Sequence, residues 1–256
     1  MKISVVIITK NEEENLPRTL KSVISWCDEI LIIDSGSTDN TVEIATSFGA
    51  TVIYNKFESF GKQKIFGVNA AKYNWILSID ADEVISDKLK AEIIALKNNS
   101  NLFQSYFIPS TNVFLGAKPK FGKESKVMKI KFFNRETCNF NENEVHEKVV
   151  TDYKSGYLKN KIIHYSYKSL HDYFSKFNLY TENAANQMFV KNKRRSFLVN
   201  FLMIPFYFIN IYFLKKNFLN GVEGLVWSTL SSFYTFVKYC KLEEMYIKKK
   251  TNNFNY

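Results

Sequence analysis

Asp80 and Asp82 are separated by a single residue. This spacing is the most direct indication in the sequence of a chemical function. Both aspartates follow an apolar run, residues 75–79, that predicts a buried strand, so both carboxylates can point to the same side of the chain. Hard divalent cations are bound by carboxylate oxygens together with the oxygens of a substrate phosphate. The pair therefore predicts a Mg²⁺ or Mn²⁺ site, and the alternative is that it only begins a loop or caps the helix after Ser86.

Two more polar clusters follow apolar strands in the same way. Thr9 and Asn11 come at the end of the strand 3–9, and Asp34 follows the strand 29–33. Because ligands bind beyond the carboxyl ends of strands in an open parallel sheet, we expect these residues to meet Asp80 at one edge. The sequence has no glycine-rich phosphate loop, which disfavours dinucleotide redox chemistry, P-loop phosphoryl transfer and nucleotidyl transfer. Capping of the strand ends is the alternative role for Thr9 and Asp34.

The elements that must position these residues alternate between strand and helix over the first hundred residues. This pattern predicts an α/β fold with a mostly parallel sheet and helices on both faces. After residue 100 the pattern changes to strands at 105–115, 127–133 and 162–167, followed by helices at 169–190 and 222–239. We therefore expect a catalytic domain over residues 1–168 and a helical region over residues 169–256.

The charge of the chain is distributed unevenly. Residues 1–100 carry 11 Lys and Arg against 14 Asp and Glu, whereas the remaining residues carry 24 against 11. A basic second half implies an anionic partner, which is a nucleic acid, a phospholipid or a phosphorylated substrate. Three widely spaced cysteines and an N-terminal apolar run too short for a signal peptide favour a reducing, cytoplasmic location with the mature chain beginning near Met1.

Residues 196–214 form an uncharged stretch of 19 residues between two basic runs. Its length is nominally enough to cross a bilayer, but Pro205, Asn200 and Asn210 interrupt it and both flanks are basic. Aromatic-rich helices with Lys and Arg at their borders suit the headgroup region of a membrane. We expect monotopic attachment to an anionic membrane surface, with a buried helical pair or a dimer interface as the alternative.

Several motifs together carry a family resemblance. The runs SVVIITKNEEENL, EILIIDSGSTDNTVEIA and GKQKIFGVNAAKYNWILSIDADE resemble the inverting glycosyltransferases of family 2, which have the GT-A fold. The runs KIKFFNRE, VHEKV, HYSYKSLHDYFSKFNLYT and FLNGVEGLVWSTLSSFYTFVKY are similar to the lipopolysaccharide-core β-glucosyltransferases within that family. The resemblance implies a UDP-sugar donor, a divalent metal and a lipid-linked saccharide acceptor.

The resemblance also implies roles for the polar residues at the strand ends. Thr9 and Asp34 would contact the uridine, with Asn11 beside them, and Asp80 would reach the ribose or the metal. Asp82 would bind the metal. Lys64 would lie near the base or the diphosphate, although relatives often have Arg there, and a lysine lacks the planar fork of an arginine. The chain also reads Asp34-Ser-Gly where many relatives read DDG, which leaves open which residue faces the uracil.

Inverting transfer requires a base to accept the proton of the acceptor hydroxyl. Glu147 lies where family members commonly have an acidic catalytic residue, and His146 would support it or approach the metal. An ordinary surface turn is the alternative for this pair, and Glu144 and Asp152 are substitutes for the base. We expect structural roles for His164 and His171, and either a phosphate contact or a solvated turn for Arg135.

The leading hypothesis is a glycosyltransferase at the cytoplasmic face of the inner membrane, with no nucleic acid as a partner. A polyprenyl-phosphate sugar synthase is the alternative enzyme, since it would share the N-terminal half. A non-catalytic basic module that binds membranes or nucleic acid is the alternative from another class.

Overall fold

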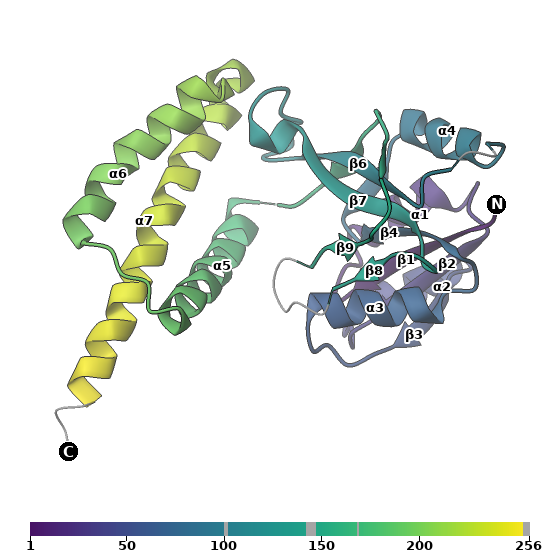
Figure 1. Cartoon of the computed structure of the whole chain (residues 1–256), viewed down its shortest axis with the longest axis horizontal. Coiled ribbons are helices and arrows are strands. Elements are labelled where there is room, and N and C mark those ends of the chain that lie inside the picture. Colours follow the sequence, from purple (N-terminus) through teal and green to yellow (C-terminus); the bar gives the residue numbers. More distant parts are fainter. Residues whose placement is uncertain (100–101, 142–146, 168, 253–256) are drawn as a thin grey trace. The chain divides into compact units, whose positions relative to one another are not determined.

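The computed structural model describes residues 1–99, 102–141, 147–167 and 169–252. The chain forms two compact units (Figure 1). The first unit contains residues 1–112 and 126–165, and the second contains residues 113–125 and 166–256. The second unit thus includes the loop 113–125, which our sequence-based division placed with the first domain.

The first hundred residues alternate strands and helices as the sequence predicts. The elements are β1 (Ile3–Thr9), α1 (Leu16–Val23), β2 (Glu29–Asp34), α2 (Thr41–Ser47), β3 (Thr51–Tyr54), α3 (Phe60–Ala70), β4 (Trp75–Asp80), β5 (Glu83–Ile85) and α4 (Asp87–Leu96). Serine caps begin two of the helices, because Ser59 Oγ accepts from Lys62 N and Ser86 Oγ accepts from Leu89 N. The short strand β5, directly after the aspartate pair, was not predicted.

The rest of the first unit is built mainly from strands. They are β6 (Ser105–Asn112), β7 (Val127–Asn134), β8 (Asn139–Phe140), β9 (Val149–Val150), β10 (Gly156–Tyr157) and β11 (Ile162–His164). The main sheet has the order β3-β2-β1-β4-β7-β6-β11-β5, with β10 paired to β6. Strands β3, β2, β1 and β4 are parallel, whereas β7 runs antiparallel to both β4 and β6. The sheet is therefore mixed, and its N-terminal half is parallel as predicted.

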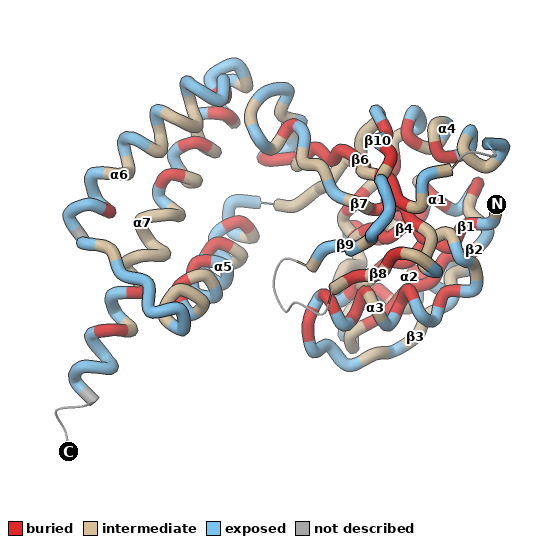
Figure 2. Tube along the Cα trace, in the orientation of Figure 1, coloured by how far each residue is buried: buried red, intermediate tan, exposed pale blue. Residues whose placement is uncertain are grey.

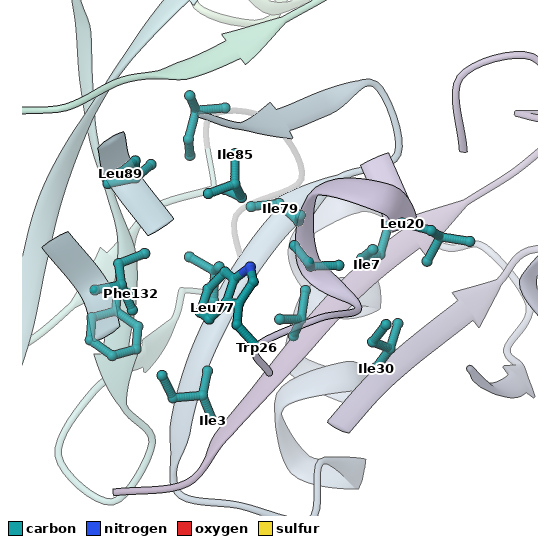
Figure 3. Packing of buried hydrophobic residues seen from close by; sticks show 14 of the residues in the cluster. Ile3, Ile7, Leu20, Trp26, Ile30, Leu77, Ile79, Ile85, Leu89 and Phe132 are labelled. Carbon is teal, nitrogen blue, oxygen red and sulfur yellow. The ribbon is translucent and has the colours of Figure 1, made fainter. Parts of the chain in front are cut away.

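Alternate residues of β1 pack into two different clusters, as expected for a strand that is buried on both faces. Ile3, Val5 and Ile7 lie in a cluster with side chains from α1, α2 and α4. Figure 3 shows part of this cluster, including Ile7 of β1 and Leu20 of α1. Val6 points the other way and packs with side chains of α3. Helices thus cover both faces of the sheet, and this confirms the predicted α/β class.

The second unit is helical. Its long helices are α5 (Leu170–Val190), α6 (Phe197–Ile209) and α7 (Gly221–Asn252), and its short turns are η1 (Lys123–Ser125), the π-helical η2 (Asn210–Leu214) and η3 (Asn217–Asn220). Phe114, Tyr173 and Trp227 pack together as an aromatic core between the loop 113–125, α5 and α7. Many residues of α6 are exposed (Figure 2).

The apolar pattern predicts a helix that ends at Tyr239, but α7 continues to Asn252, about thirteen residues further. Its last turns are polar and include an i,i+4 ion pair between Lys248 and Glu244. No single helix in the described chain is long and apolar enough to cross a membrane. Residues 198–214 and 217–251 satisfy the length and composition criteria only together, as a pair bent by 68°.

Candidate active site

The three predicted strand ends share one edge of the sheet. Thr9 is directly opposite Asp34 in the pairing of β1 with β2, and Ile8 is opposite Asp80 in the pairing of β1 with β4. The hydroxyl of Thr9 donates to Asp34 Oδ1 at 3.1 Å. The fold therefore brings together polar residues that lie about seventy positions apart in the sequence.

Asp34 organises the turn that follows β2. Its carboxylate accepts hydrogen bonds from the backbone of Gly36 and of Ser37, and from the hydroxyl groups of Ser37 and Thr9. Burial alone would raise the pKa of Asp34, but these hydrogen bonds lower it below the ordinary value. These four hydrogen bonds occupy the four lone-pair sites of the carboxylate. A hydrogen bond from uracil to Asp34 would therefore have to replace one of them.

Asn11 lies against the same turn. It has a positive φ of 55°, a conformation that asparagine tolerates better than most residues. Its side-chain Oδ1 accepts from Thr38 N at 2.8 Å, and its backbone N donates to Ser37 Oγ at 2.9 Å. Asn11 thus joins the loop after β1 to the loop after β2.

A network of buried and partly buried charges lies at the end of β4. Lys64 Nζ of α3 is 3.1 Å from Asp80 Oδ1 and 2.8 Å from Glu147 Oε1. Lys131 Nζ of β7 is 3.1 Å from Asp80 Oδ2 and 2.6 Å from Glu83 Oε2. The structure therefore brings the predicted donor residues Lys64 and Asp80 to the predicted base Glu147.

Opposite charges set the protonation states in this network. Burial alone would raise the pKa of Asp80, but the charges of Lys131, Lys64 and His164 hold it well below the ordinary value. The pKa of Glu147 is lowered for the same reason, because Lys64 outweighs its burial. Burial would lower the pKa of Lys64 and of Lys131, yet the neighbouring carboxylates raise both. All four groups are therefore charged at neutral pH.

Asp82 is paired with a histidine from a distant strand. His164 Nε2 is 3.1 Å from Asp82 Oδ1, and His164 Nδ1 is 3.1 Å from Asn112 Oδ1. Burial would lower the pKa of His164, but the hydrogen bond to Asp82 and the nearby carboxylates raise it. Sequence reasoning assigned His164 a structural role, whereas the structure brings it to the predicted metal ligand.

The residues at this edge fit a divalent cation whose coordination is completed by oxygen atoms of a bound substrate. No described group of three or more His, Cys, Asp or Glu has the arrangement of a self-sufficient metal site. Asp82 offers a carboxylate, and His164 offers Nε2 once a cation replaces the proton that it shares with Asp82, while Asp80 Oδ1 lies 3.1 Å from Lys64 Nζ. Mg²⁺ and similar ions are commonly held by one or two carboxylates plus substrate phosphates.

Some predicted residues have other surroundings. His146 and Glu144 lie outside the described residues. Arg135 Nη1 donates to the backbone carbonyls of Val68 and Ala71 at the end of α3. Ser169, rather than His171, caps α5 by accepting from Asp172 N.

Sequence reasoning missed two buried polar residues, Lys131 and Gln63. Lys131 lies in the run KIKFF, two residues after the exposed Lys129. Strand alternation predicts that residues two apart share one face of the sheet, so it does not single out Lys131 as buried. Gln63 Nε2 donates to Ser35 Oγ at 3.0 Å and so connects α3 to the turn after β2. Gln63 falls within the run GKQKIFGVNAAKYNWILSIDADE, which carries part of the family resemblance and was therefore a signal that could have pointed to it.

The family follows from sequence comparison. The sequence model of glycosyl transferase family 2 matches residues 4–189. An uncharacterized glycosyltransferase of Rickettsia typhi is 31% identical over 97% of this chain and 89% of its own length. The chain belongs to glycosyltransferase family 2.

More distant similarities extend this comparison. The lipopolysaccharide core biosynthesis glycosyltransferase LpsC of Rhizobium meliloti is 24% identical over 98% of this chain and 95% of its own length. Among solved structures, residues 1–349 of TarS from S. aureus match at 14% identity and a TM-score of 0.48, covering 97% of this chain and 92% of that one. As a family 2 member with this mixed sheet, the protein is a glycosyltransferase with the predicted GT-A fold.

Proposed function

We propose that this glycosyltransferase moves a hexose from a UDP-sugar, with inversion, to a lipid-linked saccharide in the synthesis of lipopolysaccharide core or another cell-envelope glycan. One observation carries the proposal, namely that Asp80 and Glu147 both pair with the buried Lys64 at a strand edge in a family 2 chain. The similarity to LpsC along nearly the whole chain supports the proposed process.

The donor is proposed to bind across the ends of β1, β2 and β4. Thr9, Asn11 and Asp34 are the candidates for the uridine, and Asp80 is the candidate for the ribose or the metal. The carboxylates of Asp80, Asp82, Glu83 and Glu147 would repel a diphosphate, so a cation is needed beside Lys64 and Lys131.

Asp82 and His164 are proposed to hold that cation, Mg²⁺ or Mn²⁺, with Asp80 close by. When bound, the cation supplies Lewis-acid stabilisation of the departing diphosphate. In this proposal Lys64 would add a positive charge to the same side of the reaction.

Glu147 is the proposed base. Its ion pair with Lys64 keeps the carboxylate deprotonated, as a base must be before it accepts a proton from the acceptor hydroxyl. The proton would pass to a carboxylate oxygen of Glu147 while the hydroxyl oxygen forms the new bond to the sugar. The sugar–phosphate bond breaks, and UDP leaves with that electron pair.

An assay of UDP release and product formation tests this proposal. UDP-sugars would be supplied with a lipopolysaccharide-core lipid fraction or with polyprenyl phosphate, since the acceptor separates the leading function from a polyprenyl-phosphate sugar synthase. Glu147→Gln is expected to lower the transfer rate by about 10²–10⁴-fold with UDP binding retained. The control Glu43→Gln changes an exposed glutamate of α2 and should leave the rate unchanged. Full activity of Glu147→Gln would exclude Glu147 as the base.

We further propose that α6 attaches the enzyme to the cytoplasmic face of the inner membrane. Exposed apolar side chains line this helix and the turn after it, and they are Leu198, Val199, Phe201, Leu202, Phe206, Ile209, Phe213 and Leu214. Basic residues flank it at 191–195 and at 215–216. Apolar side chains bordered by Lys and Arg favour an anionic membrane surface.

Vesicle co-sedimentation tests the attachment. Leu202→Asp is expected to reduce binding to anionic vesicles at least tenfold, because it places a charge on the exposed apolar side of α6. Leu179→Asp is the matched control, since Leu179 is a similarly exposed leucine of α5. Equal losses in both variants would contradict attachment through α6.

A further inference from the structure

The second unit contains a cavity that the proposed reaction does not use. It has a volume of about 290 Å³, near the lower end of the range for small-ligand sites. Residues of α5, of the connection to α6 and of α7 line it, and they are Ala184, Gln187, Met188, Lys191, Lys193, Lys238 and Tyr239. Three of these seven residues are lysines, so the cavity wall is strongly cationic.

A fourth cation, Arg195, packs on a residue of this wall, Tyr239. The guanidinium of Arg195 is 4.7 Å from the centre of the Tyr239 ring, and Lys238 Nζ is 5.4 Å from the centre of that ring. The connection between α5 and α6 is fixed against α7 nearby, because the Tyr246 hydroxyl donates to Lys193 O. The cations therefore converge on one place rather than being spread along a solvated helix.

These cations have no anionic partner in the described part of the chain. No ion pair joins Lys191, Lys193, Arg195 or Lys238 to a carboxylate of residues 1–99, 102–141, 147–167 or 169–252. Arg195 Nη1 is enclosed and makes no hydrogen bond within those residues. An enclosed donor without an acceptor is costly, and this cost is removed when a ligand supplies the acceptor.

The electrostatics of Lys238 indicate the same missing anion. Burial lowers the pKa of Lys238, and the positive charges of Arg195 and Lys193 lower it further. Like charges held this close repel each other, so a bound anion would relieve both the repulsion and the loss of hydration.

We propose that this cavity is a binding site for a phosphate or diphosphate group. Phosphate oxygens suit both the planar fork of an arginine and the point charges of lysines. The phosphate is carried either on a membrane-anchored lipid or on a free ion. The lipid source rests on the proposed function, because a lipid-linked acceptor or an anionic headgroup would deliver its phosphate to the membrane-facing unit.

Binding to the full chain tests the site. Inorganic pyrophosphate would be titrated by calorimetry, and vesicles of phosphatidylcholine with and without phosphatidic acid would be co-sedimented. The double variant Arg195→Gln/Lys238→Gln is compared with Lys118→Gln/Lys120→Gln, which removes the same charge from exposed positions of the same unit. We expect the first to weaken phosphate binding at least tenfold and the second to weaken it less than threefold.

Gln187→Glu provides a second variant that keeps every cation and adds a carboxylate to the cavity wall. It too should weaken phosphate binding at least tenfold. Loss only for phosphatidic acid vesicles assigns the site to a lipid, and loss for pyrophosphate as well assigns it to phosphate in general. Equal losses in the two double variants, or no loss with Gln187→Glu, would overturn the proposal.

UDP binding, followed separately, distinguishes this inference from the proposed function. A cavity variant that binds UDP normally but not phosphate supports a separate site. Phosphate binding in a wild-type protein that binds no UDP-sugar would leave the cavity site in place and remove the proposed transfer reaction.

Discussion

At the scale of single residues, Lys131 connects the proposed catalytic edge to the stability of the fold. It is 5% exposed and pairs with both Asp80 and the buried Glu83. Glu83 Oε2 in turn accepts from Asp80 N at 2.9 Å, so the two carboxylates and the lysine hold the end of β4 in one conformation. Removing the cation would leave the buried carboxylate of Glu83 without its lysine partner, while Asp80 would keep its ion pair with Lys64.

Lys131→Met is therefore expected to lower the free energy of unfolding by about 3–5 kcal/mol. Urea denaturation measures this loss. Lys129→Met is the control, because Lys129 lies on the same strand and is exposed, and it should change stability by less than about 0.5 kcal/mol. Similar stabilities for the two variants would show that the Lys131 network contributes little.

Asp34→Asn tests the turn after β2 through its pH dependence. The variant has one acceptor oxygen where the carboxylate has two, so it cannot accept all four hydrogen bonds, and we expect it to be less stable by about 1.5–3 kcal/mol at pH 7. The folded-state pKa of Asp34 is lowered, so its contribution is present above the ordinary value of 3.8 and is lost as the pH falls through the lower folded value.

Urea denaturation at pH 7 and in the acid range below 3.8 follows this difference between the wild type and Asp34→Asn. The difference should shrink in acid. The exposed Asp152→Asn should show little difference at either pH. A difference for Asp34→Asn that stays constant into acid would contradict the role of the ionised carboxylate.

At the scale of elements, the position of Lys64 depends on how closely α3 approaches the sheet. Gly67, one turn further along α3, faces β1 and β2. A methyl group there would lie 2.6 Å from Val6 Cγ1 and 2.9 Å from Ile33 Cγ1, which is closer than carbon atoms can pack. The glycine thus allows α3 to lie against the strands and to present Lys64 to Asp80.

Gly67→Ala is expected to destabilise the protein by about 1–3 kcal/mol through overpacking, despite the better helix propensity of alanine. Thermal unfolding provides the measurement. Asn69→Ala, at an exposed position of the same helix, should be neutral or slightly stabilising. A stabilising Gly67→Ala would mean that α3 can move away from the sheet without cost.

The sequence predicted the elements of the N-terminal half well, because their signals are local. The strand 3–9 and the helix beginning at Leu16 have clear periodicities and end at polar residues. The antiparallel insertion of β7 between β4 and β6, and the short strand β5, depend on pairing between distant residues. Periodicity within a segment carries no information about such pairing.

The same distinction applies to the site. Strand ends can be predicted to meet from topology alone, and Thr9, Asp34 and Asp80 do meet. The pairing of His164 with Asp82 could not be predicted, because it depends on β11 lying beside β5 and β6. For the same reason Lys131 was missed, since its partners come from β4 and β5.

At the scale of the whole molecule, the division of charge follows the division into units. The acidic first hundred residues lie in the unit with the candidate donor site, and the basic run 191–195 lies in the helical unit together with Lys215, Lys216 and Lys238. This division suits an enzyme that binds a cation and a nucleotide sugar in one unit and an anionic surface with the other.

The central claim is that Asp82 helps to bind a cation and a UDP-sugar at the strand edge, and thermal unfolding with UDP and Mn²⁺ tests it most directly. At a ligand concentration of about one hundred times Kd, binding adds about 2.7 kcal/mol, which corresponds to a rise in Tm of about 5 °C or more. We predict this rise for the wild type with both ligands, and little rise with UDP alone or for Asp82→Asn. An equal rise without Mn²⁺ and in Asp82→Asn, or no rise with any nucleotide sugar, would contradict the account.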